Sequence, residues 1–383
     1  MFGFLLKNNL NMLRVSQSVL GNEESKAVKR IIEQDGYLGM GTETRLFEED
    51  IANYLSVSSE RVCAVNTGTS AIHLVCDYFF EPGDEVLIPS ITYVASFQAV
   101  SACGAIPVPC DVDIATGLLD LNDAEARITK KTKGIMYVHY ASSCGNLKKI
   151  TDFATSKNLK LIHDSAHSFG SAYNQNLIGS QSGVFCFSFD GIKNVTSGEG
   201  GAVVSDNLNL IRYCNDARLL GVEKDTEQRY KGKRSFAFNV SHQGYRYHMS
   251  NLNAAIGRVQ LQKFISLFRS KRISLRESYI LSLSNLSHLT VLDSSENCQI
   301  VPHIMPILLN DAETKNRLIK VFNSNKIQYG IHYFPNHLLN YYKTDYSLLN
   351  SENFYERQIT LPLHPNMGIT EIKQVTNLIK SIL

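Results

Sequence analysis

The chain has 383 residues, 44% of them hydrophobic, and its formal net charge is +2, from 38 basic and 36 acidic side chains. This length and composition predict a large buried core, in two domains or in one large domain with an appendage. The near balance of charge, without long runs of one sign, argues against nucleic acid or a membrane surface as the main partner. Small molecules are the better expectation.

The spacing of the cysteines and the first residues of the chain indicate in which cellular compartment the protein is expected. The eight cysteines are scattered without a C-x-x-C pair, so we expect reduced, mostly buried thiols, no disulfide framework and no metal site. The apolar run within residues 1–7 is too short for a signal peptide or a membrane span. We therefore expect a cytoplasmic protein. Residues 1–11 fit no predicted element, and Met12 is an alternative start.

Short apolar runs alternate with helical patterns along the first half of the chain. A helix opens at residues 21–24 and ends at 35–36, and a glycine-rich connection, either a substrate loop or a plain linker, leads to a second helix near 43–55. The alternating elements that follow are strands at 61–66, 85–89, 106–110, 134–139 and 159–164, with helices from 71, from 93, near 121–128 and at 147–157. This alternation predicts βαβ units and a mainly parallel sheet, with ligands beyond the carboxyl ends of the strands.

The second half of the chain begins with a lysine between two apolar runs. The first run ends at Ser188, a polar loop presents Lys193, and a glycine cluster leads into the second run. The further expected elements are a helix at 208–220, a charged and exposed loop at 223–234, a long helix from 251 toward 276, a strand at 304–309, a helix near 314–325 and a final helix. We expect a large domain over residues 14–250, and a linking helix with a small α/β domain over 251–383.

Three positions on this predicted sheet are candidates for chemistry. Lys193, on a turn between buried strands, can be desolvated, which lowers its pKa and favours Schiff-base formation; the alternative is a solvated loop lysine. Residues 67–70 precede a helix and form either an anion site or a simple helix cap. Asp164 ends a buried strand and needs a partner, either the next helix or a cofactor's pyridinium nitrogen.

An anion site, an acidic strand end and a loop lysine, in that chain order on a parallel sheet, are what pyridoxal phosphate (PLP) requires. The anion site suits the phosphate end of the cofactor, the acidic strand end suits its ring nitrogen, and the lysine suits its aldehyde.

Over about residues 14 to 380 the sequence resembles the fold-type-I sugar-nucleotide aminotransferases of the DegT/StrS type. The matching pieces are Gly-Tyr-Leu-Gly-Met-Gly at 36–41, Asn-Thr-Gly-Thr-Ser-Ala at 66–71, Pro-Ser-Ile-Thr-Tyr-Val-Ala at 89–95, His-Asp-Ser-Ala-His at 163–167, Ser-Phe-Asp-Gly-Ile-Lys-Asn-Val-Thr-Ser-Gly-Glu-Gly-Gly at 188–201, Gly-Tyr-Arg-Tyr-His-Met-Ser at 244–250 and Leu-Pro-Leu-His at 361–364. The resemblance implies an aspartate-aminotransferase-like α/β fold with a mainly parallel central sheet flanked by helices and a smaller C-terminal α/β domain.

The resemblance also implies roles for single residues. Lys193 attaches PLP covalently, and the other cofactor-binding residues are Asp164 at the ring nitrogen, Thr69, Ser70 and Ser188 at the phosphate, Tyr93 over the ring, His167 toward the ring oxygen and Arg246 from a second subunit of a homodimer. The candidate substrate-binding residues are Tyr37, Gly39, His332, Tyr333 and His337. The departures from the usual family pattern are His167 for glutamine, Arg246 for asparagine, His248 for arginine and Ala141-Ser142 for a glycine.

The implied reaction moves an amino group from an amino acid, with L-glutamate expected, to a ketone on a nucleotide-linked deoxysugar. We favour C4 of a 4-keto-6-deoxyhexose, in the synthesis of a surface polysaccharide such as the O-antigen of lipopolysaccharide. Amination of a 3-keto sugar or a keto-cyclitol remains an alternative, as does a non-catalytic relative that binds a sugar nucleotide. Lys193 argues against the dehydratase branch, in which histidine replaces the lysine, and the glycine fingerprint of a nicotinamide dehydrogenase is missing after the first strand.

Overall fold

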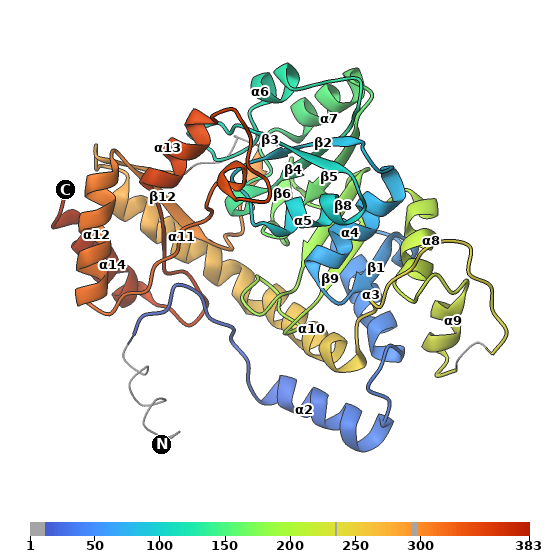
Figure 1. Ribbon diagram of the computed structural model, residues 1–383. Helices are drawn as coiled ribbons and strands as arrows, with labels where there is room; N and C mark the ends of the chain where they lie inside the picture. The colour runs from blue at the N-terminus through green and yellow to red at the C-terminus, as the bar shows by residue number, and fades with distance from the viewer. Residues whose placement is uncertain (1–11, 234–235, 293–296) are drawn as a thin grey trace.

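The computed structural model of the protein describes residues 12–233, 236–292 and 297–383. A seven-stranded sheet flanked by helices is joined by one long helix to a smaller α/β unit (Figure 1). The expected α/β fold with a mainly parallel sheet is therefore confirmed. Residues 1–11, for which the sequence predicts no element, lie outside the described residues.

The central sheet is built from short, almost wholly buried strands. In order across the sheet they are β1 (Val62–Val65), β9 (Gly201–Ser205), β8 (Val184–Ser188), β5 (Lys160–Asp164), β4 (Thr132–Val138), β2 (Glu85–Pro89) and β3 (Ile106–Cys110). Only β9 runs antiparallel to its neighbours in this sheet, because the loop of residues 189–200 returns the chain directly from β8. That loop carries Lys193, as predicted.

Side chains alternate between two hydrophobic cores, one on each face of the sheet. In β1, for example, Cys63 and Val65 face one core, while Val62 and Ala64 face the other. The helices that cover the first face are α4 (Gly68–Phe79), α5 (Ala95–Ala102) and α8 (Leu208–Ala217). Those on the second face are α3 (Thr42–Leu55), α6 (Leu121–Ala126), α7 (Leu147–Ser156) and α10 (Asn251–Lys263). Each crossover thus buries an apolar helix face against the sheet.

The long helix runs further than the sequence predicts. After α10 a π-helical turn (Phe264–Phe268) leads without a break into α11 (Arg269–Leu283), and the whole helix runs diagonally between the two units in Figure 1. At its end a third core is enclosed by β10 (Leu289–Val291), β12 (Met305–Leu309), β13 (Gln358–Leu361), α12 (Ala312–Ser324) and α14 (Ile369–Lys380). The smaller α/β unit is this core with its elements.

The remaining elements are short or peripheral. They are α2 (Asn22–Arg30) with its π-helical extension (Ile31–Asp35), α9 (Asp225–Tyr230), α13 (Leu349–Arg357), the 3-10 turns Ser59–Arg61, Tyr140–Ser142 and Asn336–Leu338, and a small sheet of β6 (Ala172–Tyr173), β7 (Asn176–Leu177) and β11 (Cys298–Gln299). Through the pairing of β11 with β6, residues 298–299 are tied to the main body of the protein.

The prediction of a charged, exposed loop over 223–234 is wrong for its middle part. Residues 225–230 form α9, in which Asp225 and Thr226 are buried. The cause is a buried ion pair between Arg218 and Glu48, which also binds the Tyr230 hydroxyl and draws this segment onto the protein. Residue 234 lies outside the described residues.

The expectation of mostly buried cysteines is confirmed, since all but Cys103 are buried. Among the described residues, no set of histidine, cysteine and acidic side chains is arranged to hold a metal ion. Within the same ranges, none of the helices combines the length and apolar character that crossing a membrane would require.

Candidate active site

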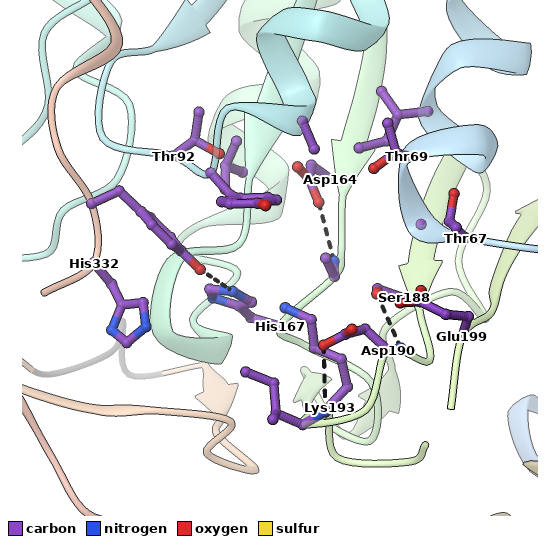
Figure 2. Close-up of a pocket in the computed structure, with 18 residues that line it drawn as sticks. Thr67, Thr69, Thr92, Asp164, His167, Ser188, Asp190, Lys193, Glu199 and His332 are labelled. Carbon is purple, nitrogen blue, oxygen red and sulfur yellow. Dashed lines mark hydrogen bonds between the residues drawn. The ribbon is translucent and has the colours of Figure 1, made fainter. Parts of the chain in front are cut away.

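A cavity of about 490 Å³ opens at the edge of the sheet where the parallel strands end. Residues that follow β1, β2, β5 and β8 line it: Thr67 to Thr69, Thr92 with Tyr93, Asp164 with His167, and Ser188. Lys193 enters from the β8–β9 loop, and His332 and Tyr333 come from the segment before α13 (Figure 2). The cavity therefore lies where the sequence predicts ligands, beyond the carboxyl ends of the parallel strands.

Lys193 points into the centre of this cavity (Figure 2). Its backbone N–H donates to the Asp190 carbonyl at 3.0 Å, which fixes the loop. Burial lowers the pKa of the Lys193 ammonium from 10.5 to about 8, although the carboxylates of Asp164 and Asp190 act in the opposite sense. A lysine with this pKa holds a substantial neutral fraction near physiological pH, which makes it a competent nucleophile and base.

One end of the cavity presents hydroxyl groups and the first turn of α4. Thr67 caps this helix, because its Oγ1 accepts from the Ser70 N–H at 2.9 Å. The Ser70 hydroxyl is itself engaged, since it donates to Asn66 Oδ1 at 2.7 Å. Thr69 and Ser188 line the cavity. The cap interpretation therefore holds for Thr67, while Thr69 and Ser188 line the cavity at this end, where hydroxyl groups could bind an anion.

Asp164, the last residue of β5, lines the cavity and is buried. Its Oδ2 accepts from the Ser96 hydroxyl at 2.7 Å, and its Oδ1 accepts from the Ala166 N–H at 3.2 Å. Burial raises the pKa of this carboxyl, while the two hydrogen bonds and Lys193 lower it. Two neutral donors do not compensate a buried carboxylate fully, so the site favours a cationic N–H group facing Asp164.

The opposite end of the cavity is a wall of imidazole and phenol rings. His167 Nε2 and the Tyr333 hydroxyl are 3.0 Å apart, and His332 Nδ1 is 2.8 Å from the Thr360 hydroxyl. Burial, with Lys193 nearby, lowers the pKa of His332 to about 4 and holds the pKa of His167 well below its usual value. Both rings are therefore neutral at physiological pH, and this wall offers hydrogen bonds without charge.

The structure does not bring every predicted site residue to the cavity. Tyr37 and Gly39 lie at the start of α10, where their carbonyl groups accept from Asn251. The buried ring of His337 is held between Ser90 and Glu352. Arg246 is exposed beside α9, within this chain.

Several lining or contacting residues were not foreseen. Glu199 lines the hydroxyl end, Ser96 holds Asp164, and His303 lies 3.5 Å from Lys193 Nζ through its Nε2 atom. Glu199 lies within the 188–201 motif, and that motif could have pointed to it. Ser96 and His303 carry no local signal, because both reach the site only through packing of distant segments.

Comparison with known proteins agrees with this geometry. The model of the DegT/DnrJ/EryC1/StrS aminotransferase family matches residues 18–380. A dTDP-4-dehydro-2,3,6-trideoxy-D-glucose 4-aminotransferase of Saccharopolyspora spinosa is 29% identical over 369 residues, which are 96% of this chain and 95% of the relative. An uncharacterized protein of Methanocaldococcus jannaschii is 30% identical over 373 residues, 95% and 96% of the two chains.

Solved structures show the same fold. The aminotransferase TlmJ from Streptoalloteichus hindustanus superimposes with a TM-score of 0.89 at 27% identity, covering 97% of this chain and 98% of that one. A putative sugar aminotransferase from Streptococcus pneumoniae, solved in PLP and PMP forms, has a TM-score of 0.86 in both, at 24% and 25% identity. The comparisons cover 97% of this chain and 100% and 97% of the pneumococcal chains.

The residues of the cavity fit PLP. The hydroxyl end and the α4 N-terminus suit a phosphate, the buried Asp164 suits a pyridinium N–H, and the Lys193 amine suits an aldehyde. His167 Nδ1 is buried without a hydrogen-bond partner among the described residues, so a ligand oxygen could satisfy it. Gly68 leaves room where a Cβ atom would lie 2.7 Å from Ser188 Cβ, which lets the two phosphate-side segments approach. With a matching family model over almost its whole length, this chain belongs to the DegT/DnrJ/EryC1/StrS family and is a PLP-dependent aminotransferase.

Proposed function

We propose that the enzyme aminates a nucleotide-linked keto-deoxysugar, at C4 of a 4-keto-6-deoxyhexose, with L-glutamate as amino donor. The Saccharopolyspora relative, whose name specifies a 4-keto deoxysugar linked to dTDP, supports this choice. Residues 244–250 also resemble the family branch that aminates C4 more than the branch that aminates C3. A 3-keto sugar or a keto-cyclitol is the competing substrate class.

The observation that carries the proposal is a lysine of lowered pKa facing a buried carboxylate across one cavity. When bound, PLP supplies a conjugated ring that takes up the electron pair released at the substrate carbon. Lys193 would hold the cofactor covalently, and its free Nζ would carry the proton between the two carbon positions that exchange it. Asp164 keeps the ring nitrogen protonated.

The other lining residues orient the cofactor. We assign the phosphate to the hydroxyls of Thr69 and Ser188, with Ser70 contributing through the cap that orders this turn. Tyr93 would lie over the ring, and His167 would face its oxygen. The neutral ring wall of His332 and Tyr333 then meets the sugar, whose uncharged hydroxyl groups need donors and acceptors rather than ions.

Charge is the reason to propose a homodimer. The phosphate and the carboxylates of the donor are anions, yet Lys193 is the one Lys or Arg side chain among the described residues that line the cavity. We propose that Arg246 of the partner subunit supplies the missing cation, in the manner implied by the family resemblance. Tyr37, Gly39 and His337, which lie away from the cavity in a single chain, are not assigned a role by this geometry.

The product of this reaction would be an activated amino sugar. We place its synthesis in the cytoplasm and its use in a surface polysaccharide, such as the O-antigen of lipopolysaccharide. This cellular assignment follows from the proposed substrate class.

The substrate is tested with the purified, PLP-loaded enzyme and a panel of 3-keto and 4-keto nucleotide sugars together with a keto-cyclitol. Each is incubated with L-glutamate, and the product is identified by mass and by NMR of the aminated carbon. We expect amination of a 4-keto-6-deoxy sugar nucleotide, with 2-oxoglutarate formed in equal amount.

Replacing L-glutamate by L-aspartate or L-glutamine in the same assay tests the donor. The Lys193→Ala variant is the control for background chemistry and should give no turnover. Amination of the 3-keto sugar or the cyclitol alone would overturn the substrate assignment, and sustained turnover by Lys193→Ala would overturn the role of the lysine.

A further inference from the structure

A third buried imidazole, His303, contacts the catalytic lysine itself. His303 is 3% exposed and lies between β11 and β12, and its Nε2 atom is 3.5 Å from Lys193 Nζ. Its ring centroid is 4.6 Å from that of His167, on the neutral wall of the cavity. Neither the family resemblance nor the sequence pattern assigns it a function.

The backbone that carries His303 is fixed from three sides. The His303 N–H donates to the Ser142 hydroxyl at 2.9 Å, and the Pro302 carbonyl accepts from the buried Arg272 at 3.2 Å. The Val301 carbonyl accepts from the Asn194 side chain at 3.1 Å. Because Asn194 directly follows Lys193 in the chain, the segment that carries the histidine and the loop that carries the lysine share one anchor. Their relative position is therefore set by the fold.

The protonation states of His303 and Lys193 decide which of the two donates the hydrogen bond. Burial and the neighbouring Lys193, with His167, Arg272 and His332 adding to the effect, hold the pKa of His303 well below its usual value, so the ring is neutral. Below pH 8 Lys193 is mainly an ammonium group, which can only donate, so Nε2 accepts and the ring proton resides on Nδ1, a buried atom without a hydrogen-bond partner among the described residues. A neutral acceptor binds the amine without adding a charge that would oppose its function.

We propose that His303 is a positioning residue for Lys193, whose Nζ it holds by accepting a hydrogen bond through Nε2, so that the free amine faces the aldehyde of PLP. This inference rests on the proposed role of Lys193. A lysine side chain has four rotatable bonds, and an amine without an acceptor would spend less time in the reactive orientation. The loss should appear in the rate at which the cofactor becomes attached.

Two variants of opposite character separate positioning from packing. His303→Phe keeps an aromatic ring of similar width but removes the acceptor, while His303→Gln supplies an acceptor oxygen on a side chain of different shape. If His303 only fills space, the phenylalanine variant should behave like the wild type and the glutamine variant should not. The positioning role predicts the reverse order.

The readout is the rate at which PLP, added to the cofactor-free full-length chain near pH 8, gives the yellow protein, with borohydride trapping to count attached cofactor. We expect His303→Phe to be about five- to tenfold slower, as for the loss of one hydrogen bond, and His303→Gln to stay within about threefold of the wild type. His364→Phe, a buried histidine outside the cavity, controls for the exchange of a ring, and thermal unfolding reports whether each variant is folded.

A folded phenylalanine variant that attaches PLP as fast as the wild type overturns the inference, and so does a folded glutamine variant that is as slow as the phenylalanine variant. Should His303→Phe not fold, His303→Ala replaces it in the same comparison. Lys193→Ala, run in parallel, should attach no cofactor. Attachment in that variant would contradict the proposed function instead, so the two failures are distinguishable.

Discussion

Lys193 occupies an environment that disfavours its charge, which has a consequence for stability. Its pKa is about 8 in the folded chain and near 10.5 when unfolded, because burial acts against the ammonium form. Below pH 8 the side chain is charged in both states, and the folded state bears the full cost, about 2 kcal/mol after allowing for partial exposure. Above pH 10.5 it is neutral in both states, and the cost vanishes.

We therefore expect Lys193→Met to stabilise the cofactor-free protein near pH 7, with a gain that fades as the pH rises from 8 to 10.5. Urea denaturation at several pH values measures the difference. Lys26→Met, at an exposed position of α2, is the matched control and should give little gain. A Lys193→Met variant no more stable than the wild type near pH 7 would show that the lysine is not desolvated.

Asp164 is expected to act on the cofactor rather than on the fold. Asp164→Asn keeps an oxygen for the Ser96 hydroxyl but removes the charge that would hold a ring nitrogen protonated. We predict a loss of turnover of roughly 100-fold or more, with PLP still attached to Lys193. Steady-state rates and the visible spectrum of the variant check this. Normal turnover would mean that the carboxylate serves only to hold the turn after β5, through its bond to the Ala166 N–H.

Ala141 and Ser142 show why a departure from the family pattern is tolerated. Both residues have positive φ angles, 51° and 72°, in a region where glycine is usual. Ser142 compensates with its hydroxyl, which accepts from the His303 N–H and donates to the His167 carbonyl. The side chain that replaces glycine therefore ties together the two segments that carry these imidazoles.

At the scale of elements, the start of β9 sets how closely the hydroxyl end of the cavity is packed. Gly201 lies against the backbone of Thr67 and Gly68, and a Cβ atom there would come 2.4 Å from the Thr67 carbonyl oxygen. We expect Gly201→Ala to weaken PLP binding about tenfold or more. The added methyl group must displace the backbone at the hydroxyl end of the cavity, although no polar group is lost.

Equilibrium titration of the cofactor-free protein with PLP measures this effect. Gly191→Ala is a matched control in the same loop region, because a Cβ atom at that position would lie 3.7 Å from its nearest neighbour, at ordinary contact distance. Equal PLP affinities for the two variants would show that the contact of Gly201 with Thr67 and Gly68 does not shape the hydroxyl end of the cavity.

The Arg218–Glu48 pair joins α3, β1 and α9. Arg218 is fully buried, and its guanidinium donates to Glu48 at 2.6 Å and to Tyr230 at 2.8 Å. Removing one partner leaves a buried, unpaired charge, so Arg218→Met should destabilise the protein by about 3–5 kcal/mol. In urea denaturation, Arg218→Met with Glu48→Met should cost much less than the sum of the single changes. Additive costs would show that the two charges do not interact.

At the scale of the whole molecule, one chain leaves an apolar surface beside its exposed arginine. Leu220, Phe238 and Val240 are 45%, 59% and 50% exposed, and Leu220 and Phe238 line a hollow with Arg246. Burial of such residues against a second copy would be favourable, and it would carry Arg246 to another subunit. The proposed homodimer with shared sites accounts for both features.

We predict that Arg246→Ala binds PLP more weakly, since the loss of one partner of a charge-assisted pair costs about 2–5 kcal/mol. Mixing it with Lys193→Ala under subunit exchange should regenerate activity, because one of the two mixed sites has both residues intact. Light scattering checks the dimer, and turnover checks the complementation. A fully active monomer, or exchange without any recovered activity, would refute shared sites.

The sequence by itself determined the mainly parallel sheet, the succession of its strands and helices along the chain, and the edge of the sheet where the cavity lies. The alternation of apolar runs with helical patterns requires a parallel sheet, and the carboxyl ends of parallel strands meet at one edge. Residues that follow a strand, such as Thr69, Asp164 and Ser188, are therefore placed near the cavity by local position alone. Lys193 joins them because its loop connects two neighbouring strands.

Only the tertiary structure decided which side chains complete the site. Ser96 reaches Asp164 from 68 positions away, and His303 reaches Lys193 from 110. It also decided that the Ser70 hydroxyl donates to Asn66 and that residues 225–230 form a helix beside a buried ion pair. These contacts depend on how elements far apart in the chain pack together, and such packing leaves no periodicity or motif in the local sequence.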